Sequence, residues 1–327
     1  MTDKSIEMAI HKLANIVITK CSSSVGSDLG KLGSVIFLLH YAKYCNMDKY
    51  KSYAIELLEY IQDNSIISNN SKVNIHNLIS ICIGINYIIS QELVLGDLDD
   101  ILEDVDNFIL SYLDNKNIMY LKYQNLIVVG KYFLLRIGAT PLSANHVLHI
   151  TALERIVGLL KLHIINIPIY NPLIIKFLYY SSKVLSNKSI EMMLIQQLNN
   201  YPNQTNWYRS GIPHCFNTFF IPKDDERLKK IIIKEIKDYV QMHSKIDYSD
   251  ILIEGNAGLI VWMNLLSDDL STEKCSAIKN AAVEKIVSNM NNYKVPIDVS
   301  LYFGCSGIGL ALLSCIDNKC TQWIKLL

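Results

Sequence analysis

The fold of this chain is decided by VSLYFGCSGIGLALL, residues Val299–Leu313, in which a glycine-rich start runs directly into a long apolar segment. The same design occurs in LGKLGSVIFLLHYAKY at Leu29–Tyr44 and in EGNAGLIVW at Glu254–Trp262. Glycine has no Cβ, so helix ends that begin with it can approach each other closely. The three segments therefore predict helices that start at glycine and are enclosed by the rest of the protein.

Weaker copies of this pattern, with a small or polar residue before an apolar segment, occur at Asn77, Asn125, Asn171 and Gly211. With the three glycine motifs they give starts at positions 30, 77, 125, 171, 211, 255 and 304, between 40 and 49 residues apart. That period fits two helices and two turns, as in helical repeat proteins. Seven helix pairs are expected.

The segments between these starts have the amphipathic pattern of helices with one wet face. The clearest example is residues 98–109, where apolar side chains recur at helical spacing and five acidic residues are assigned to the water-facing side: Asp99, Asp100, Glu103, Asp104 and Asp106. An open array would expose its apolar last helix, so ring closure is favoured. We expect an all-α fold, a closed α/α toroid of about seven hairpins with inner and outer helix layers.

Composition narrows the possible functions. Half of the 327 residues are hydrophobic and 19% are charged, which favours a large core, and the zero net charge gives nucleic-acid binding little support. Residues 73–91 and 299–316 are free of charge, but their polar and small residues favour buried helices over membrane spans. Eight cysteines without a CxxC pair, and an N-terminus without a signal pattern, predict a cytoplasmic protein without a disulfide framework.

The openings at Leu29–Tyr44 and Val299–Leu313, together with the closing WIKLL at Trp323–Leu327, resemble the lanthionine synthetase C-like family, the lantibiotic cyclases. The resemblance covers residues 1–327 and implies one double-layered α toroid domain. It also implies a Zn²⁺ ion that activates a cysteine thiol of a precursor peptide for addition to a dehydrated Ser or Thr. Zinc suits this reaction because coordination deprotonates a thiol at neutral pH.

The cysteine and histidine ligands of the family's zinc motifs are all replaced by other residues in this chain. The WCxG element falls on residues 207–210, where Tyr208 replaces cysteine. The CHG element falls on Ile253, Glu254 and Gly255, where isoleucine and glutamate replace cysteine and histidine. The family's fourth-repeat histidine is matched by Tyr170, whose ordinary pKa of about 10 makes it a poor base at pH 7. Because this chain departs from the family at these positions, no metal is expected at the family's usual site, and no other cofactor is expected.

A rearranged centre is the alternative. His214 and Cys215 are adjacent and follow Pro213, and a third ligand could come from Glu254, Cys305 or His76. Zinc is expected only if this site forms. Tyr170, Glu254 and Cys305 are the catalytic candidates, although Cys305 is also explained as a small residue that permits close packing.

Ligand binding is expected at the mouth of the toroid, where the amide donors of the inner helix starts would face the cavity. The side chains assigned to this mouth are Tyr208, Arg209, His214 and Glu254. HVLH, at residues 146–149, has metal-like spacing but falls on an expected outer helix and is left out of the site.

Three functions compete. The first is a degenerate family member that binds a peptide substrate or a peptide-modifying protein partner without zinc-dependent cyclisation. The second is an active cyclase with the rearranged metal or thiol centre. The third is a glycosidase-like α/α toroid that uses Glu254 with Asp247, Asp250 or Asp298, since glycosidases work with paired carboxylates.

Overall fold

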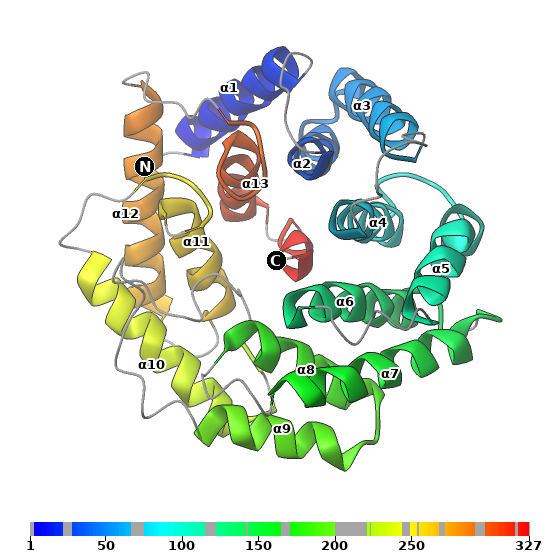
Figure 1. The fold of residues 1–327 in the computed structure, drawn as a ribbon. Coiled ribbons are helices and arrows are strands. Elements are labelled where there is room, and N and C mark those ends of the chain that lie inside the picture. The colour runs from blue at the N-terminus through cyan, green and yellow to red at the C-terminus, as the bar shows by residue number, and fades with distance from the viewer. Residues whose placement is uncertain are drawn as a thin grey trace. The chain divides into compact units, whose positions relative to one another are not determined.

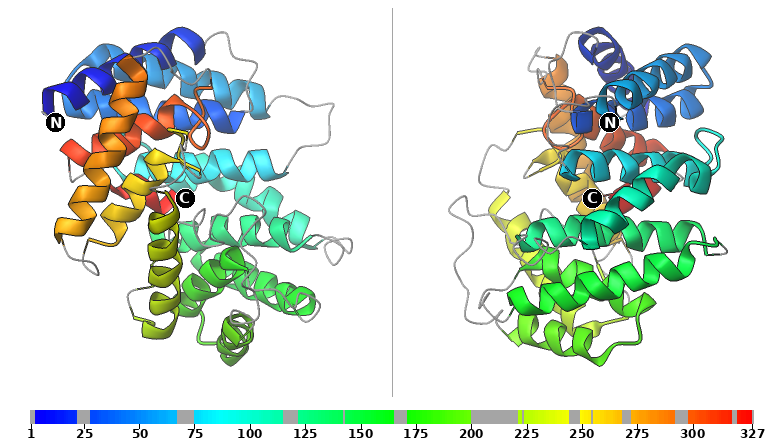
Figure 2. Two further views of the ribbon diagram at one scale, coloured as in Figure 1. Left: turned by 90° about the vertical axis from the view of Figure 1, so that its left-hand side faces the viewer. Right: turned by 45° about the vertical axis from the view of Figure 1, so that its right-hand side comes forward.

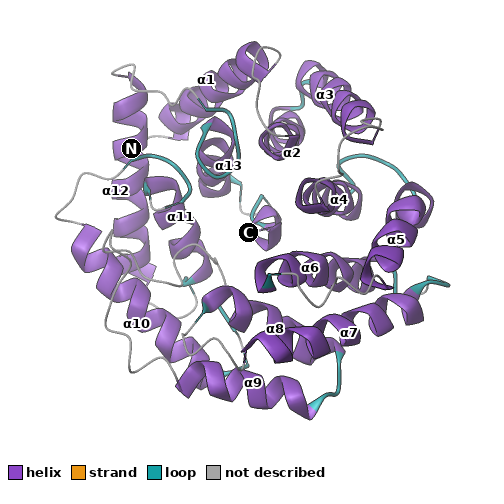
Figure 3. Cartoon of the chain, in the orientation of Figure 1, coloured by secondary structure: helices purple, strands orange, loops and turns teal. Residues whose placement is uncertain are grey.

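The computed structural model describes residues 3–21, 28–66, 75–114, 122–141, 143–164, 171–199, 221–222, 224–243, 249–253, 255–267, 272–291, 298–317 and 320–326. These residues form thirteen α-helices and a C-terminal 3₁₀ turn, and no strand occurs among them (Figure 3). The all-α prediction is confirmed. Within the same residues, no helix combines the length and the apolarity needed to cross a membrane.

The chain divides into two compact units. Unit 1 comprises residues 1–72 and 211–327, and unit 2 comprises residues 73–210. The helices of unit 1 are α1 (Asp3–Cys21), α2 (Asp28–Cys45), α3 (Asp48–Ile66), α10 (Glu226–His243), α11 (Asn256–Leu265), α12 (Thr272–Asn291) and α13 (Cys305–Ile316). Those of unit 2 are α4 (Ile75–Ser90), α5 (Leu98–Asp114), α6 (Tyr123–Ala139), α7 (His146–Ile164), α8 (Pro172–Val184) and α9 (Lys188–Asn199).

Helices that are largely buried alternate along the chain with amphipathic helices that have one solvent-exposed face, as the sequence pattern predicts. Every residue from Cys305 to Ser314 in α13 is buried, whereas α1 buries a single stripe that includes Ile6, Ile10 and Leu13. Helices α2, α4, α6, α8, α11 and α13, which we call the enclosed helices although Leu173 and Tyr180 of α8 are exposed, begin within two residues of the expected positions 30, 77, 125, 171, 255 and 304. The remaining expected start, Gly211, lies outside the described residues.

In unit 1 the last enclosed helix packs against the first helices of the chain. Helix α13 contacts α1, α2 and α11, and α1 also contacts α12 (Figures 1 and 2). Trp262 of α11 and Trp323 of the 3₁₀ turn are both fully buried. The last helices of the chain thus pack against the first within unit 1.

Glycine permits the closest approaches in this core. The loop before α13 runs past α2, and a Cβ at Gly33 would lie 2.6 Å from Cβ of Leu301 and 2.9 Å from its backbone nitrogen. A Cβ at Gly307 would collide with the carbonyl oxygen of the same Leu301, and one at Gly309 would meet the ring of Phe37. At these positions the glycines serve packing.

In unit 2, α6 is the central helix and contacts α4, α7 and α8, while α8 also contacts α9. Gly130 of α6 lies against the ring of Phe177 of α8, so these two enclosed helices are in close contact at that point. Each unit therefore has enclosed helices at its centre. The closed toroid remains a prediction.

Candidate functional site

In unit 1 the starts of α11 and α13 have the same local structure. The backbone N–H of Asn256 donates to the carbonyl of Ser249 at 2.9 Å, and that of Cys305 donates to the carbonyl of Asp298 at 2.9 Å. The preceding residues, Gly255 and Gly304, are both extended, with φ/ψ of −131°/−172° and −135°/−167°. The repeat predicted from the glycine motifs is therefore a repeat of backbone structure, with an offset of 49 residues.

Hydrogen bonds join these starts to one another and to α2. The Ile253 N–H donates to the carbonyl of Tyr302 at 3.2 Å, which links the loops before α11 and α13. Ser34 of α2 donates its hydroxyl to the carbonyl of Val299 at 3.1 Å and lies 3.1 Å from the hydroxyl of Ser306. The starts of α11, α13 and α2 thus form a continuous row in unit 1.

The amides at the heads of these helices are used within the row. The N–H groups of Asn256 and Cys305 donate to carbonyls of their own loops, so these two amides are already engaged within the protein. The row is a structural joint at these two positions.

Cys305, the one catalytic candidate among the described residues, is fully buried. Burial raises the pKa of its thiol to about 11, and the charge of Asp298 adds to the rise. A thiol with this pKa is protonated at pH 7 and is a weak nucleophile. Close packing explains the residue better than catalysis does.

The two described carboxylates of the glycosidase alternative have structural roles. Asp250 is 8% exposed and accepts hydrogen bonds from the side-chain amides of Asn256 at 2.8 Å and Asn289 at 3.0 Å. Asp298 is exposed and accepts the backbone N–H of Ser300 at 2.7 Å. Asp250 therefore ties the start of α11 to α12, and Asp298 shapes the loop before α13.

In unit 2 the enclosed helices are also joined at their starts, here by polar side chains. His76 of α4 lies with Nε2 2.5 Å from Oδ1 of Asn125 in α6. Asn171 caps α8 by accepting the N–H groups of Leu173 and Ile174, and donates its side-chain amide to the Tyr123 hydroxyl at 3.1 Å. These partly exposed groups form a row of hydrogen-bonding side chains along α4, α6 and α8.

Two lysines of the central helices of unit 2 have altered acidity. Burial lowers the pKa of Lys131 in α6 to about 8. Burial, reinforced by the nearby positive charge of Lys131, holds the pKa of Lys176 in α8 well below its ordinary value. Two ammonium groups therefore influence each other where α6 and α8 pack together.

Unit 2 contains a buried charged cluster that the sequence pattern does not predict. Arg136 of α6 is fully buried, and its Nη2 contacts Asp106 at 2.8 Å and Asp99 at 2.7 Å. Asp106 also accepts hydrogen bonds from the Tyr132 hydroxyl and from Nε2 of His149, the latter at 3.1 Å. This Asp106 cluster connects α5, α6 and α7.

One expectation is wrong at this cluster. The pattern predicts Asp106 on the water-facing side of α5, but Asp106 is 1% exposed. His149, the second histidine of HVLH on the expected outer helix, is fully buried. The spacing held a signal, because Asp106 continues the buried row made by Leu98, Leu102, Ile109 and Leu113.

The other candidate residues lie outside the described residues: Tyr170, Tyr208, Arg209, His214, Cys215, Asp247 and Glu254. The metal alternative built on His214 and Cys215 and the binding site at the toroid mouth therefore stay predictions. His76, a proposed third ligand, is placed beside Asn125. Within the described part of the chain, no three His, Cys, Asp or Glu side chains are grouped closely enough to hold a metal ion.

Comparison with known proteins adds no further constraint: no family model, curated protein or solved structure matches the chain.

Proposed function

We propose that this protein is a divergent lanthionine synthetase C-like protein that binds a peptide, or a partner that modifies peptides, without zinc-dependent thioether cyclisation. One observation carries the proposal. The enclosed helices start at the positions expected from the motifs that resemble this family, and the loops before α11 and α13 share one hydrogen-bonding pattern 49 residues apart. A closed toroid of seven hairpins is part of the proposal, since the contact of α13 with α1 and α2 suits ring closure.

The chemistry of the residues favours binding over catalysis. Tyr208, Ile253 and Glu254 occupy the positions that match the family's zinc ligands, and only Glu254 among them offers a metal-binding carboxylate. The thiol of Cys305 is buried with a raised pKa and offers no ready nucleophile. A zinc-activated thiol would need a different ligand set.

Polar groups suited to peptide recognition are present in unit 2. His76, Tyr123, Asn125 and Asn171 are partly exposed donors and acceptors on three neighbouring helices. A cytoplasmic location is part of the same proposal, because all seven described cysteines are free thiols, as is usual in a reducing compartment.

The test combines elemental analysis with a cyclisation assay. The purified full chain is incubated with added zinc and a synthetic peptide that holds one cysteine and one dehydroalanine, and remaining peptide thiol is counted by maleimide labelling and mass spectrometry. We expect well under one equivalent of zinc and full labelling, with binding of the peptide seen as a rise in fluorescence anisotropy. About one equivalent of zinc, lost in Cys215→Ala together with cyclisation, would overturn the proposal in favour of the rearranged enzyme.

A further inference from the structure

Helix α5, which packs on α4 in unit 2 (Figure 1), has an exposed apolar row beside its buried one. Ile101, Val105, Phe108 and Tyr112 are separated by four, three and four residues, which is the spacing of a coiled-coil seam. At 3.6 residues per turn these four positions span only about 60° of the helix circumference. Ile101 and Phe108 are each 41% exposed, and the other two are partly exposed. We name this row the α5 seam.

The loop before α5 extends the α5 seam. A Cβ at Gly96 would lie 2.7 Å from Cδ1 of Ile101, so this loop lies against the first residue of the seam. The neighbouring Leu95 is 92% exposed, more than any other large apolar residue that the structure describes. Contiguous exposed apolar surface of this kind is typical of protein interaction sites.

One edge of the α5 seam is acidic. Asp104 and Asp100 lie about 40° and 80° beyond Phe108 around the helix, on the side away from the buried row, and both are exposed. Helix α5 contains no basic residue, and the arginines that pair with it, Arg136 and Arg155, contact other carboxylates. Within the described part of the chain, the carboxylates of Asp100 and Asp104 form no ion pair, so both remain available to a partner.

The α5 seam is held in place from another side of its helix. Asp106 lies about 130° around α5 from the middle of the seam and contacts Arg136 at 2.8 Å and His149 at 3.1 Å. These contacts fix α5 against α6 and α7. A partner would therefore meet a surface that is already formed, which lowers the entropic cost of binding.

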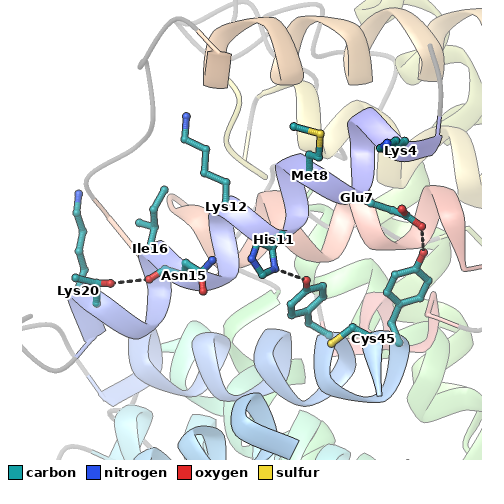
Figure 4. Close-up of a pocket in the computed structure, with 12 residues that line it drawn as sticks. Lys4, Glu7, Met8, His11, Lys12, Asn15, Ile16, Lys20 and Cys45 are labelled. Atoms are coloured by element: carbon teal, nitrogen blue, oxygen red, sulfur yellow. Dashed lines mark hydrogen bonds between the residues drawn. The ribbon is translucent and has the colours of Figure 1, made fainter. Parts of the chain in front are cut away.

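The hollow of about 1120 Å³ beside α1 in unit 1 differs, because its central polar groups bind each other (Figure 4). The Glu7 carboxylate accepts the Tyr44 hydroxyl at 2.7 Å, and Nδ1 of His11 lies 2.9 Å from the Tyr41 hydroxyl. Lys12 donates to a backbone carbonyl of α12 at 2.7 Å. These groups hold α1 on its neighbours, whereas the acidic edge of the α5 seam is unpaired.

We propose that the α5 seam binds a basic, amphipathic helical segment of a partner peptide. Such a helix would pack its apolar row on the seam and place Lys or Arg side chains opposite Asp100 and Asp104. At 1.5 Å per residue, the seam from Ile101 to Tyr112 is about 16 Å long, which matches three turns of a bound helix. A second copy of α5 would bring the same carboxylates, and an anionic lipid surface would bring like charge, so repulsion disfavours both.

This inference deepens the proposed function and rests on it, because it names the chemistry of the peptide. The probe is a fluorescein-labelled peptide of about 18 residues, with Leu at alternating spacings of three and four, Lys on both sides of that row, and Ala or Gln elsewhere. Binding to the full chain is followed by fluorescence anisotropy at about 50 mM and about 300 mM NaCl. We expect saturable binding that weakens as salt rises, and no binding of matched peptides with Glu in place of Lys or with the same residues in scrambled order.

The apolar part of the α5 seam is tested by Ile101→Gln/Phe108→Gln. This variant should weaken binding about tenfold or more, because the two largest apolar contacts of the seam are lost. The matched control is Leu162→Gln/Met192→Gln, which makes the same kind of change at exposed positions of α7 and α9 and should bind like the unmodified chain. Far-ultraviolet circular dichroism and urea unfolding verify that each variant is folded.

The acidic edge is tested by Asp100→Asn/Asp104→Asn. Binding should weaken about threefold or more at low salt and less at high salt, because two exposed charge pairs are removed. The matched control is Glu154→Gln/Glu191→Gln, which removes the same charge at exposed positions of α7 and α9 and should leave binding unchanged.

Undiminished binding by Ile101→Gln/Phe108→Gln, or losses equal to those of the matched controls, would overturn the inference. Dimerisation of the full chain that this variant abolishes, without binding of the probe, would overturn it in favour of a second copy. If the dehydroalanine peptide of the cyclisation assay binds and the basic probe does not, only this inference fails. Zinc-dependent cyclisation would instead overturn the proposed function, whatever the basic probe does.

Discussion

Replacing Asp106 by asparagine should destabilise unit 2 by about 3 kcal/mol. Asn keeps the shape of the side chain but removes the charge that faces the fully buried Arg136 at 2.8 Å. Removing one member of a buried ion pair costs about 3–5 kcal/mol, because the remaining charge stays in a dry environment. The lower end applies here, since Asp99 still contacts the same guanidinium at 2.7 Å.

The measurement is urea unfolding followed by far-ultraviolet circular dichroism. Because the chain has two compact units, the unfolding curve is fitted with two transitions, and the transition that shifts in the variant is compared separately from the other. Asp104→Asn is the matched control, since it makes the same chemical change on the exposed side of α5 and should alter stability by less than about 0.5 kcal/mol.

Lowering the pH should remove the same stabilisation by the Asp106 carboxylate. Burial alone would raise the pKa of Asp106, but hydrogen bonds from His149, Arg136 and Tyr132 and the charge of Arg136 outweigh burial and leave the pKa lowered. The stabilisation is therefore complete above the ordinary carboxylate pKa and is lost as pH falls through the lowered value. A loss below about 1 kcal/mol in Asp106→Asn, or an equal loss in Asp104→Asn, would refute the reasoning.

Three further outcomes are expected. Gly33→Ala should lower the free energy of unfolding in urea by about 1–3 kcal/mol, because its Cβ would lie 2.9 Å from the backbone nitrogen of Leu301. Gly158→Ala, whose Cβ would meet nothing within 4 Å, should raise it by about 0.5–1 kcal/mol. Equal effects of the two substitutions would contradict the packing role of Gly33. Because folding lowers the pKa of Lys131 from 10.5 to about 8, the unfolded chain binds its proton more readily, and the stability should rise between pH 8 and 10.5. Lys131→Met should flatten that rise, by at most roughly 3 kcal/mol and by less because the side chain is partly exposed. An unchanged pH profile of stability in Lys131→Met would contradict this prediction. Cys305 should resist iodoacetamide at pH 8 in the folded protein while the partly exposed Cys45 reacts faster, as read by peptide mass spectrometry; rapid labelling of Cys305 would contradict its burial.

The positions of the enclosed helices were predictable because a largely buried helix lacks the row of charged residues that a solvent-exposed face carries. A helix such as α13, with ten consecutive buried residues, has no wet face, and a residue without Cβ precedes it. Both features are visible in one sequence. Helix starts were accordingly predicted to within two residues for the six enclosed helices that the structure describes.

The side-chain roles were less predictable, because they depend on partners that are distant in sequence. Asp106 has the residue type of a wet face, yet it meets Arg136 and His149, which are 30 and 43 residues away. The packing role of Gly33 depends on Leu301, at the opposite end of the chain. Periodicity identifies the face on which a residue lies, but it does not identify the partner.

The joint between Ser34 and Ser306 has a consequence for biosynthesis. Its two members are 272 residues apart, so at a translation rate of about 5–20 residues per second the first waits roughly 14–54 s for the second. During that interval the apolar surfaces of α1 and α2 that α13 will cover have no native cover from that helix. Newly made chains should therefore depend on a holding chaperone until the ribosome has released α13.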